Sequence, residues 1–369
     1  MHGGFETFAE QLSLFLVSRG HEVTVYCQVN PGEPEFADVW RGVRRIGLAE
    51  KDTPFGTIKF DLRSAFVASH HRNAIILTLG YNTAIFSLLY RVRGIRHFMN
   101  MDGIEWKRRK WSRAQRMWLW ANEWFGSHLA NQLIADHPEI KNHLNRNVSS
   151  DKITVIPYGA DAITESDPEI VRRFSLEPGK YFLVVARPEP ENSLLEIVTA
   201  YSKKPRSFPL VVLGKYMRDK NPYHAAVMDA AGNSTVLFPG ALYDATTVRA
   251  LRFHSAAYLH GHQVGGTNPS LIESLAAGNA IIANDNVFNR WSAGSSARYF
   301  SSIEQLAEHF DQVEEGPSVL EEMRSGSRLR HQACFTCEAV LEAYEELLLG
   351  RPLSNDAWQR LLCQSLGRA

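Results

Sequence analysis

The sequence predicts an α/β protein of two domains, each with a doubly wound parallel sheet covered by helices on both faces. Two observations support this class. Short apolar runs of strand length alternate with helical patterns along most of the chain, as is typical of such sheets. The chain of 369 residues also exceeds the size at which a single hydrophobic core usually keeps growing, so two domains are expected.

The chain opens with a predicted helix rather than a strand. Apolar side chains recur at helical spacing over residues 5–16, and residues 23–25 then alternate in polarity as a strand does. Later strands are expected at a series of short apolar runs, at 133–135, 153–156, 181–186, 210–213, 236–238, 256–260 and 280–283. From residue 320 onward helical patterns dominate.

The domain boundary is expected where turn-forming residues collect. The stretch 157–178 is rich in Gly, Asp, Glu and Pro and separates two series of strands. We therefore expect an N-terminal Rossmann-like domain over 1–165 and a C-terminal Rossmann-like domain over 166–335. Helices in 336–369, ending in the amphipathic piece Trp358–Leu366, are expected to pack back on the first domain.

Composition limits the compartment and the partners. The 40 Lys and Arg residues balance the 40 Asp and Glu residues, so no overall field favours nucleic acid. Four cysteines in a chain of this length do not suggest a disulfide framework, and no secretory signal is evident, so we expect a cytoplasmic protein. The longest uncharged stretch, 74–90, is interrupted by Gly80 and predicts strand, turn and helix rather than a membrane span.

Polar and small residues follow the predicted strands of the second half. Arg187, Lys215 and His262 each come just after an apolar run. In doubly wound sheets ligands bind beyond the carboxyl ends of the strands, so these side chains are candidates for a binding site. The guanidinium of Arg187 suits a diphosphate, whereas an ion pair with Glu189 or Glu191 is the structural alternative. For His262, contacts with sugar hydroxyls and core packing both remain open.

The segment 265–273 carries the richest pattern. Gly265 and Gly266 permit close backbone approach, Asn268 can cap a helix, and Pro269 suits its first turn. A helix that starts in this way, with exposed amides, attracts phosphate, and Glu273 could accept hydrogen bonds from a ribose diol. The alternative is an ordinary capped helix with Glu273 on a solvated face. Neither a Walker motif nor GxGxxG occurs, which disfavours P-loop ATPases and typical dinucleotide oxidoreductases.

These motifs together resemble the retaining glycosyltransferases of family 4. Residues 2–7 (HGGFET) and 19–25 (RGHEVTV) are similar to the glycine loop, first helix and second strand of that family, and 156–161 (IPYGAD) to its interdomain signature. The phrases GGFETF, MDGIEWKR and VGGTNPS resemble a bacterial rhamnosyltransferase-like subgroup.

The resemblance implies a GT-B fold and a nucleoside-diphosphate sugar as donor, with dTDP-rhamnose first, and transfer with retention and without a metal or other cofactor. The acceptor would be a glycan, either a lipid-linked or a cell-surface polysaccharide precursor. The site residues follow by position. Arg187 would neutralise the diphosphate and Glu273 would bind ribose. The segment Gly266, Thr267, Asn268 and Ser270, with Lys215 and His262, would line the donor site, and Gly3 and Gly4 would let the first domain close over the donor.

Two candidates belong to the first domain. Asp102 follows a predicted strand and could orient a sugar or acceptor hydroxyl, or it could be a turn residue before Gly103. Nine basic residues between Arg91 and Arg116 are interleaved with tryptophans. They could lie on an anionic membrane, at the inner face of the cell membrane, or they could form a solvated basic face with tryptophans in the core.

The chain departs from the family pattern at three places. Asn192 stands where the family usually has lysine, and Gly265 where it has the first of two glutamates. The family's first strand is also absent before Gly3, for which we expect a truncated sequence or a start assigned too late. These departures keep open a rival interpretation, a non-catalytic GT-B module that binds a nucleotide or a partner.

Overall fold

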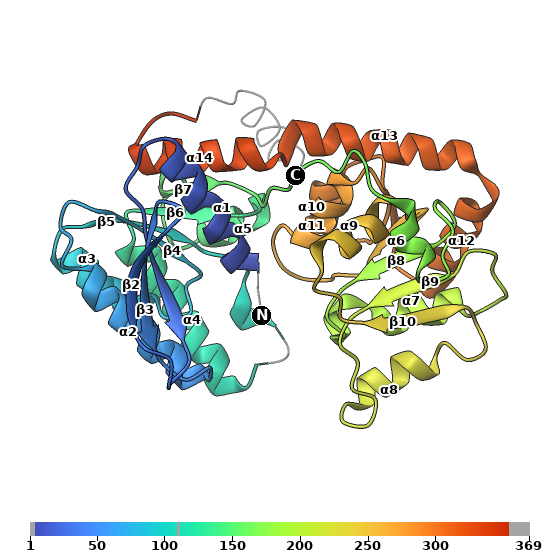
Figure 1. The fold of residues 1–369 in the computed structure, drawn as a ribbon, viewed down its shortest axis with the longest axis horizontal. Coiled ribbons are helices and arrows are strands. Elements are labelled where there is room, and N and C mark those ends of the chain that lie inside the picture. The colour runs from blue at the N-terminus through green and yellow to red at the C-terminus, as the bar shows by residue number, and fades with distance from the viewer. Residues whose placement is uncertain (1–3, 109–110, 354–369) are drawn as a thin grey trace. The chain divides into compact units, whose positions relative to one another are not determined.

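The computed structural model describes residues 4–108 and 111–353 (Figure 1). Contacts divide the chain into two compact units. Unit 1 runs to Pro157 and takes up the chain again at Val340, and unit 2 runs from Tyr158 to Ala339. Both units contain parallel sheets with covering helices, which confirms the predicted α/β class.

Unit 1 opens with a helix that is followed by strands, as the sequence predicted. Its elements are α1 (Gly4–Ser18), β1 (Thr24–Val29), β2 (Phe36–Trp40), β3 (Val43–Ala49), α2 (Pro54–Ala68), β4 (Ile75–Leu79), η1 (Ala84–Ser87), α3 (Leu88–Val92), β5 (Arg96–Asn100), η2 (Glu105–Lys107), α4 (Arg113–Leu129), β6 (Gln132–Ala135), α5 (Pro138–Leu144), η3 (Ser150–Lys152) and β7 (Ile153–Val155). The uncharged stretch 74–90 thus folds as β4, η1 and the start of α3, and within the described residues no helix is both long and apolar enough to cross a bilayer.

The strands of unit 1 form two sheets. One has the order β1-β3-β2 and the other the parallel order β4-β5-β6-β7, so β1 and β4 each have a strand neighbour on one side only. Among the described residues no strand precedes α1. The antiparallel strand β2 was not predicted. It is joined to β3 by Arg41 and Gly42, whose positive φ angles of 49° and 86° suit a two-residue hairpin turn.

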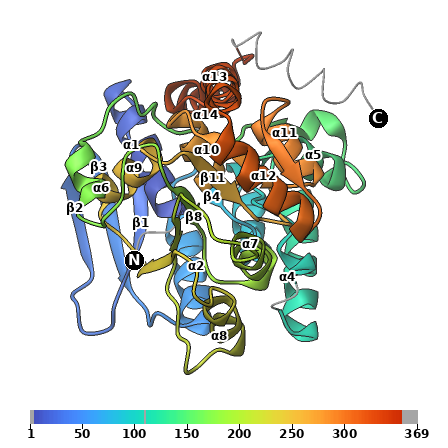
Figure 2. The same cartoon turned by 90° about the vertical axis from the view of Figure 1, so that its right-hand side faces the viewer.

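Unit 2 contains one six-stranded sheet, with the order β10-β9-β8-β11-β12-β13 and all neighbours parallel. Its helices flank the sheet in both views (Figures 1 and 2). The elements are α6 (Pro168–Arg172), β8 (Phe182–Val185), η4 (Pro190–Asn192), α7 (Leu194–Tyr201), β9 (Leu210–Leu213), α8 (Pro222–Asp229), β10 (Val236–Gly240), α9 (Ala245–Phe253), β11 (Ala257–His260), α10 (Pro269–Ala276), β12 (Ala280–Asn284), α11 (Val287–Ala293), β13 (Arg298–Phe300), α12 (Ile303–Glu315) and α13 (Pro317–Cys334).

The sheet of unit 2 buries both of its faces. Along β8, Phe182 and Val184 enter one apolar cluster, whereas Leu183 enters the cluster on the opposite face. All three side chains are at most 1% exposed. A strand buried on both sides reads as a continuous apolar run, which is why the sequence pattern located these strands well.

The connection between the units is hydrogen-bonded to the junction of α13 with α14 (Cys337–Leu349). The Ala160 amide donates to the carbonyl of Phe335 at 2.9 Å, and the Cys337 amide donates to the carbonyl of Ala160 at 3.2 Å. Beyond this junction α14 packs on unit 1, where Tyr344 lies 4.8 Å from the ring of Phe8. The predicted amphipathic piece Trp358–Leu366 lies outside the described residues.

Candidate functional site

The carboxyl ends of four neighbouring strands meet at one edge of the sheet in unit 2. The strands β9, β8, β11 and β12 are adjacent and parallel. They lead into Gly214, Ala186, Gly261 and Asp285. Because ligands bind beyond this edge in doubly wound sheets, the loops that start there define the candidate site.

Arg187 begins the loop after β8 with an exposed side chain. The alternative ion pair with Glu189 or Glu191 is absent, since the guanidinium has no carboxylate partner in the part of the chain that the structure describes. The carbonyl of Arg187 accepts a hydrogen bond from Nδ2 of Asn192 at 2.8 Å. The backbone is thereby held while the guanidinium stays available for an anionic ligand.

The loop after β8 is tied to the loop after β11. The Gln263 amide donates to the carbonyl of Glu191 at 2.9 Å, and the Ser193 hydroxyl donates to the carbonyl of Gly261 at 2.7 Å. A Cβ atom at Gly261 would lie 2.1 Å from the carbonyl oxygen of Asn192, so the close approach requires glycine. These bonds bring the segments 187–193 and 261–263 together.

The N-cap of α10 at Asn268 was predicted correctly, but its effect on the backbone amides of the first turn was not. Asn268 accepts the Ser270 amide at 3.0 Å through its side chain, and Pro269 takes the first helical position. The carbonyl of Asn268 also accepts the amides of Leu271 and Ile272, at 3.0 and 3.2 Å. The prediction of free amides in the first turn is therefore wrong, because each of these three amides already has a partner in the chain.

The amides that remain for a ligand lie just ahead of the helix. Among the described residues, the backbone N–H groups of Gly265, Gly266 and Asn268 have no acceptor. Gly265 has a φ angle of +123°, a backbone conformation that residues with a side chain rarely adopt. Thr267, which follows, is only 4% exposed. This glycine loop precedes the positive end of α10, where an anion is stabilised.

Glu273 is held by a buried arginine rather than lying on a freely solvated face. Its carboxylate pairs with Nη2 of Arg252 at 2.6 Å, and the Arg252 side chain is 8% exposed against 36% for Glu273. The same guanidinium donates to the Ser270 hydroxyl at 2.9 Å. Ser270 in turn donates to the carbonyl of Val185 at 3.2 Å, so Glu273 and α10 are fixed to the end of β8.

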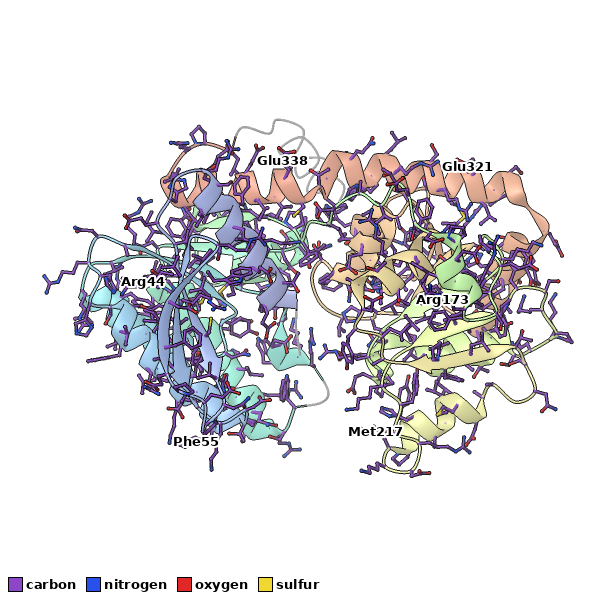
Figure 3. The ribbon with its side chains drawn as sticks, in the orientation of Figure 1. Arg44, Phe55, Arg173, Met217, Glu321 and Glu338 are labelled. Atoms are coloured by element: carbon purple, nitrogen blue, oxygen red, sulfur yellow. The ribbon has the colours of Figure 1, made fainter. Side chains whose placement is uncertain are left out.

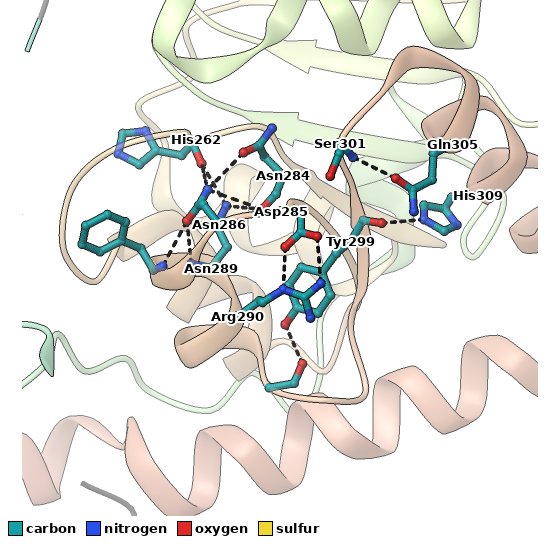
Figure 4. Close-up of polar contacts among 12 residues, drawn as sticks. His262, Asn284, Asp285, Asn286, Asn289, Arg290, Tyr299, Ser301, Gln305 and His309 are labelled. Carbon is teal, nitrogen blue, oxygen red and sulfur yellow. Dashed lines mark hydrogen bonds and ion pairs between the residues drawn. The ribbon is translucent and has the colours of Figure 1, made fainter. Parts of the chain in front are cut away.

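His262 is surrounded by side-chain amides (Figure 4). Nδ2 of Asn286 and Nδ2 of Asn289 both donate to its carbonyl, at 3.0 and 2.9 Å. Its Nδ1 lies 2.6 Å from Oδ1 of Asn192. Because Nδ2 of Asn192 donates to Arg187, Oδ1 must accept here, so the Nδ1 of His262 carries a proton. Asn192 therefore links the loops of Arg187 and His262.

Lys215 follows β9 with an exposed side chain. A Cβ atom at Gly214 would lie 2.8 Å from the carbonyl oxygen of Ala186, so the ends of β9 and β8 approach closely. The structure thus brings Arg187, Lys215 and the α10 loop to one edge of unit 2.

The remaining predicted residues belong to unit 1. Asp102 has a positive φ of 50°, a backbone conformation that residues other than glycine adopt less often. Its backbone amide donates to Oδ1 of Asn100 at 2.8 Å. Gly80 donates to the carbonyl of Asn100 at 3.0 Å, and Phe5 lies beside Gly80, so Gly4 at the start of α1 is near the same strand ends. Gly3 lies outside the described residues.

The sequence analysis did not identify several residues at the strand ends of unit 1 and unit 2. Asp136 and His137 follow β6, and the pairing of Asn100 with Ile134 places them beside the end of β5. The strand-end rule that was applied to the second half would have found both. Arg252 gave no such signal, because it lies at the end of α9 and reaches Glu273 only through the tertiary fold.

The CxxC spacing of Cys334 and Cys337 does not form a reactive pair. Both cysteines are buried and neither is in a disulfide; Cys334 ends α13 and Cys337 begins α14. Burial raises the pKa of both thiols, to about 11 for Cys337, where Asp161 adds to the effect. No group of three or more potential metal ligands occurs in the described parts of the chain.

Alkylation should therefore be slow at both thiols in the native protein. Three units below its pKa, only about one Cys337 in a thousand is ionised at pH 8. Iodoacetamide treatment followed by mass spectrometry should leave Cys334 and Cys337 unmodified in the folded chain and should label them after denaturation. Labelling of both in the native state at the rate of a free thiol would contradict the structure.

Comparison with known proteins agrees with this architecture. Residues 2–162 match the family model Glycosyltransferase Family 4. Among curated protein sequences none matches the chain. The N-terminal region is therefore similar to the domain of glycosyltransferase family 4.

Solved structures with little sequence identity share the fold. Sucrose-phosphate synthase from Thermosynechococcus elongatus has a TM-score of 0.78 at 17% identity, covering 94% of this chain and 93% of that one. HepE of Anabaena, in complex with UDP and glucose, has a TM-score of 0.74 at 11% identity and 94% and 96% coverage. An α,α-trehalose-phosphate synthase from Burkholderia xenovorans has a TM-score of 0.72 at 10% identity and 95% and 96% coverage. The chain thus has the GT-B fold.

Proposed function

We propose that this chain is a glycosyltransferase that moves a sugar from a nucleoside-diphosphate donor to an acceptor hydroxyl with retention of configuration. One observation carries the proposal. In unit 2 the loop of Arg187 and the loop of Gly265 and Gly266 are joined by hydrogen bonds between Glu191 and Gln263 and between Asn192 and His262. A permanent cation and unpaired backbone amides at one strand edge suit a diphosphate.

The donor residues have separate tasks in this proposal. Arg187 and the amides of Gly265 and Gly266 stabilise the negative charge that develops as the anomeric C–O bond breaks and the nucleoside diphosphate leaves. Glu273, oriented by Arg252, accepts a hydrogen bond from the 3′-hydroxyl of the nucleotide, and also from the 2′-hydroxyl where the donor is a ribonucleotide such as UDP-glucose. The sugar would lie towards His262, which other side chains hold by its carbonyl and by Nδ1.

The remaining donor candidates act through position. Lys215 adds positive charge beside the end of β8. The Ser270 hydroxyl is bonded to Arg252 and to the carbonyl of Val185, so it fixes α10 rather than contacting the donor. Asn268 caps α10 behind the glycine loop, and Thr267 is buried.

The acceptor would bind at the strand ends of unit 1. Asp102 would hold the attacking hydroxyl, and Asp136 on the neighbouring strand end is a second carboxylate for acceptor hydroxyls. Catalysis would then depend on positioning the acceptor and on stabilising the leaving group, with no metal required. Gly4, at the start of α1, precedes Phe5, whose ring lies beside Gly80 at the end of β4.

We propose rhamnose as the transferred sugar, from dTDP-rhamnose, and a lipid-linked or cell-surface polysaccharide precursor as the acceptor, at the cytoplasmic face of the membrane. The support is the likeness of the three sequence phrases to the rhamnosyltransferase-like subgroup. UDP-glucose is the second donor to test, because HepE was solved with it.

A thermal-shift panel of nucleoside diphosphates and their sugars tests the donor assignment. Stabilisation grows with ligand concentration over Kd, reaching about 2.7 kcal/mol at a hundredfold excess. We expect the dTDP compounds to raise Tm most. Free nucleosides should have little effect, because the site binds the diphosphate. A panel in which no nucleoside diphosphate shifts Tm would contradict the donor site.

The rival function, a non-catalytic module, is favoured by one observation. Asn192, at the position where the family usually has lysine, uses both ends of its amide to link Arg187 and His262. It therefore has a structural role and supplies no charge. Turnover decides between the two functions: release of nucleoside diphosphate from a bound donor supports the enzyme, and tight binding with no release supports the rival.

A further inference from the structure

The strongest surface feature outside the donor site is the uncovered side of α4 in unit 1. Helical spacing of i, i+4, i+7, i+11 and i+15 places five residues in one stripe along this helix. They are Arg113, Met117, Trp120, Trp124 and His128, named here the α4 stripe. Figure 2 shows the helix along its length.

The α4 stripe is exposed although its middle is apolar and aromatic. Met117 is 70% exposed, Trp120 52% and Trp124 47%. The opposite side of the helix is anchored, since Asn122 accepts the Ile85 amide at 3.0 Å and Gly126 packs beside Met99. These large side chains are therefore presented by a fixed helix and are not a loosely packed part of the core.

The chain segment that carries the stripe is basic in sequence. Between Trp106 and Ala135 the only carboxylate is Glu123, against six Lys and Arg residues. Glu123 is 3% exposed and is bonded to Nε1 of Trp106 at 2.9 Å and to Nε2 of His143 at 2.8 Å. It therefore does not offset the exposed cations, which include Lys107 and Arg113.

We propose that the α4 stripe docks this chain on an anionic phospholipid bilayer. Trp120 and Trp124 would enter the interface of the bilayer, where amphipathic indole rings are favoured, and Arg113 and Lys107 would meet the lipid phosphates. A second copy of the chain fits less well, because the stripe contains no carboxylate to pair with the cations of its partner. The functional role of this docking rests on the proposed lipid-linked acceptor. Binding to the bilayer itself does not require a bound sugar donor.

Vesicle flotation of the full chain tests the docking. Vesicles of phosphatidylcholine with about 30% phosphatidylglycerol should carry the protein, and vesicles of phosphatidylcholine alone should not. The double variant Trp120→Ser/Trp124→Ser should lose about tenfold or more in partitioning to the anionic vesicles. Arg113→Gln should lose less, and added salt should weaken what binding remains.

A matched control lies on α2 of the same unit. Phe55, labelled in Figure 3, is 67% exposed, and Nζ of Lys59 lies 5.0 Å from its ring centroid. Phe55→Ser/Lys59→Gln removes an exposed aromatic ring and a cation from a different helix and should partition as the wild type does. Unchanged Tm values in both double variants would show that their folding is intact.

Three results would overturn the proposal. The first is no flotation with anionic vesicles, and the second is equal loss in the control and the stripe variants. The third is a wild-type dimer that Trp120→Ser/Trp124→Ser converts to a monomer in size-exclusion chromatography, which would assign the stripe to a second copy. The Tm rise caused by nucleoside diphosphate should persist in the stripe variants, so failure of docking is distinguishable from failure of the donor site.

Discussion

Arg187→Ala should lower donor turnover by about 10²–10³-fold while leaving the fold unchanged. The guanidinium is exposed and has no carboxylate partner in the described part of the chain, so its removal breaks no ion pair. What it removes is a fixed cation at the place where the leaving diphosphate gains charge. The measurement is release of nucleoside diphosphate at saturating donor, together with Tm.

Arg173→Ala is the control for this experiment. Arg173, labelled in Figure 3, is exposed in unit 2 and lies just after α6, ahead of β8 rather than in a loop that follows a strand of the sheet. It should keep wild-type turnover. Arg187→Lys should recover only part of the activity, because an ammonium group lacks the planar fork of a guanidinium. Wild-type turnover in Arg187→Ala would remove the residue from the site.

Arg252→Ala should have the largest effect on stability among the site residues. The substitution removes the partner of Glu273 and the donor to Ser270 in one step and leaves a space where a buried side chain stood. We expect a loss of about 2–4 kcal/mol, by analogy with broken buried pairs, and a fall of roughly 5–15 °C in Tm. Donor affinity should fall with it, because Glu273 and the start of α10 lose their anchor.

Glu273→Gln separates the loss of stability from the loss of donor affinity. Glutamine keeps the shape and can still accept from Arg252, so the stability loss should be smaller than in Arg252→Ala. Donor affinity should still fall, and more for UDP donors, whose ribose has two hydroxyls for the carboxylate, than for dTDP donors, whose deoxyribose has one. Donor affinity unchanged in Glu273→Gln would show that the carboxylate serves only the fold.

The strands of unit 2 were predictable because they are buried on both faces. A run such as 181–186 has no polar interruption, and β8 lies within it. The hairpin of β2 and β3 was missed for the opposite reason. β2 is largely exposed, so it lacks a clear apolar pattern. Its turn uses Arg41 before Gly42 in place of the usual Asn or Asp, so the turn sequence did not indicate a hairpin either.

The candidate site was predictable where a residue follows its strand directly. Arg187, Lys215 and His262 were located by this rule, and the structure places all three at one edge of unit 2. The network behind them was not predictable, because Arg252 reaches Glu273 from a different helix. Pairwise contacts of this kind depend on helix packing, which a local sequence pattern does not encode.

The backbone amides that we propose to bind phosphate show a further limit of prediction from sequence. Asn268 was identified as a cap, yet a cap that binds the helix amides also removes them from a ligand. The unpaired amides belong instead to Gly265, Gly266 and Asn268, in the loop just ahead of the helix. The glycine at position 265, which stands where the family usually has glutamate, makes this loop conformation accessible.

A crystal structure of the full chain with a bound nucleoside diphosphate would test the central claim most directly. The diphosphate oxygens should accept hydrogen bonds from the guanidinium of Arg187 and from the amides of Gly265 and Gly266, with the ribose against Glu273. A diphosphate bound away from this edge of unit 2, with Arg187 still turned to solvent, would contradict the account.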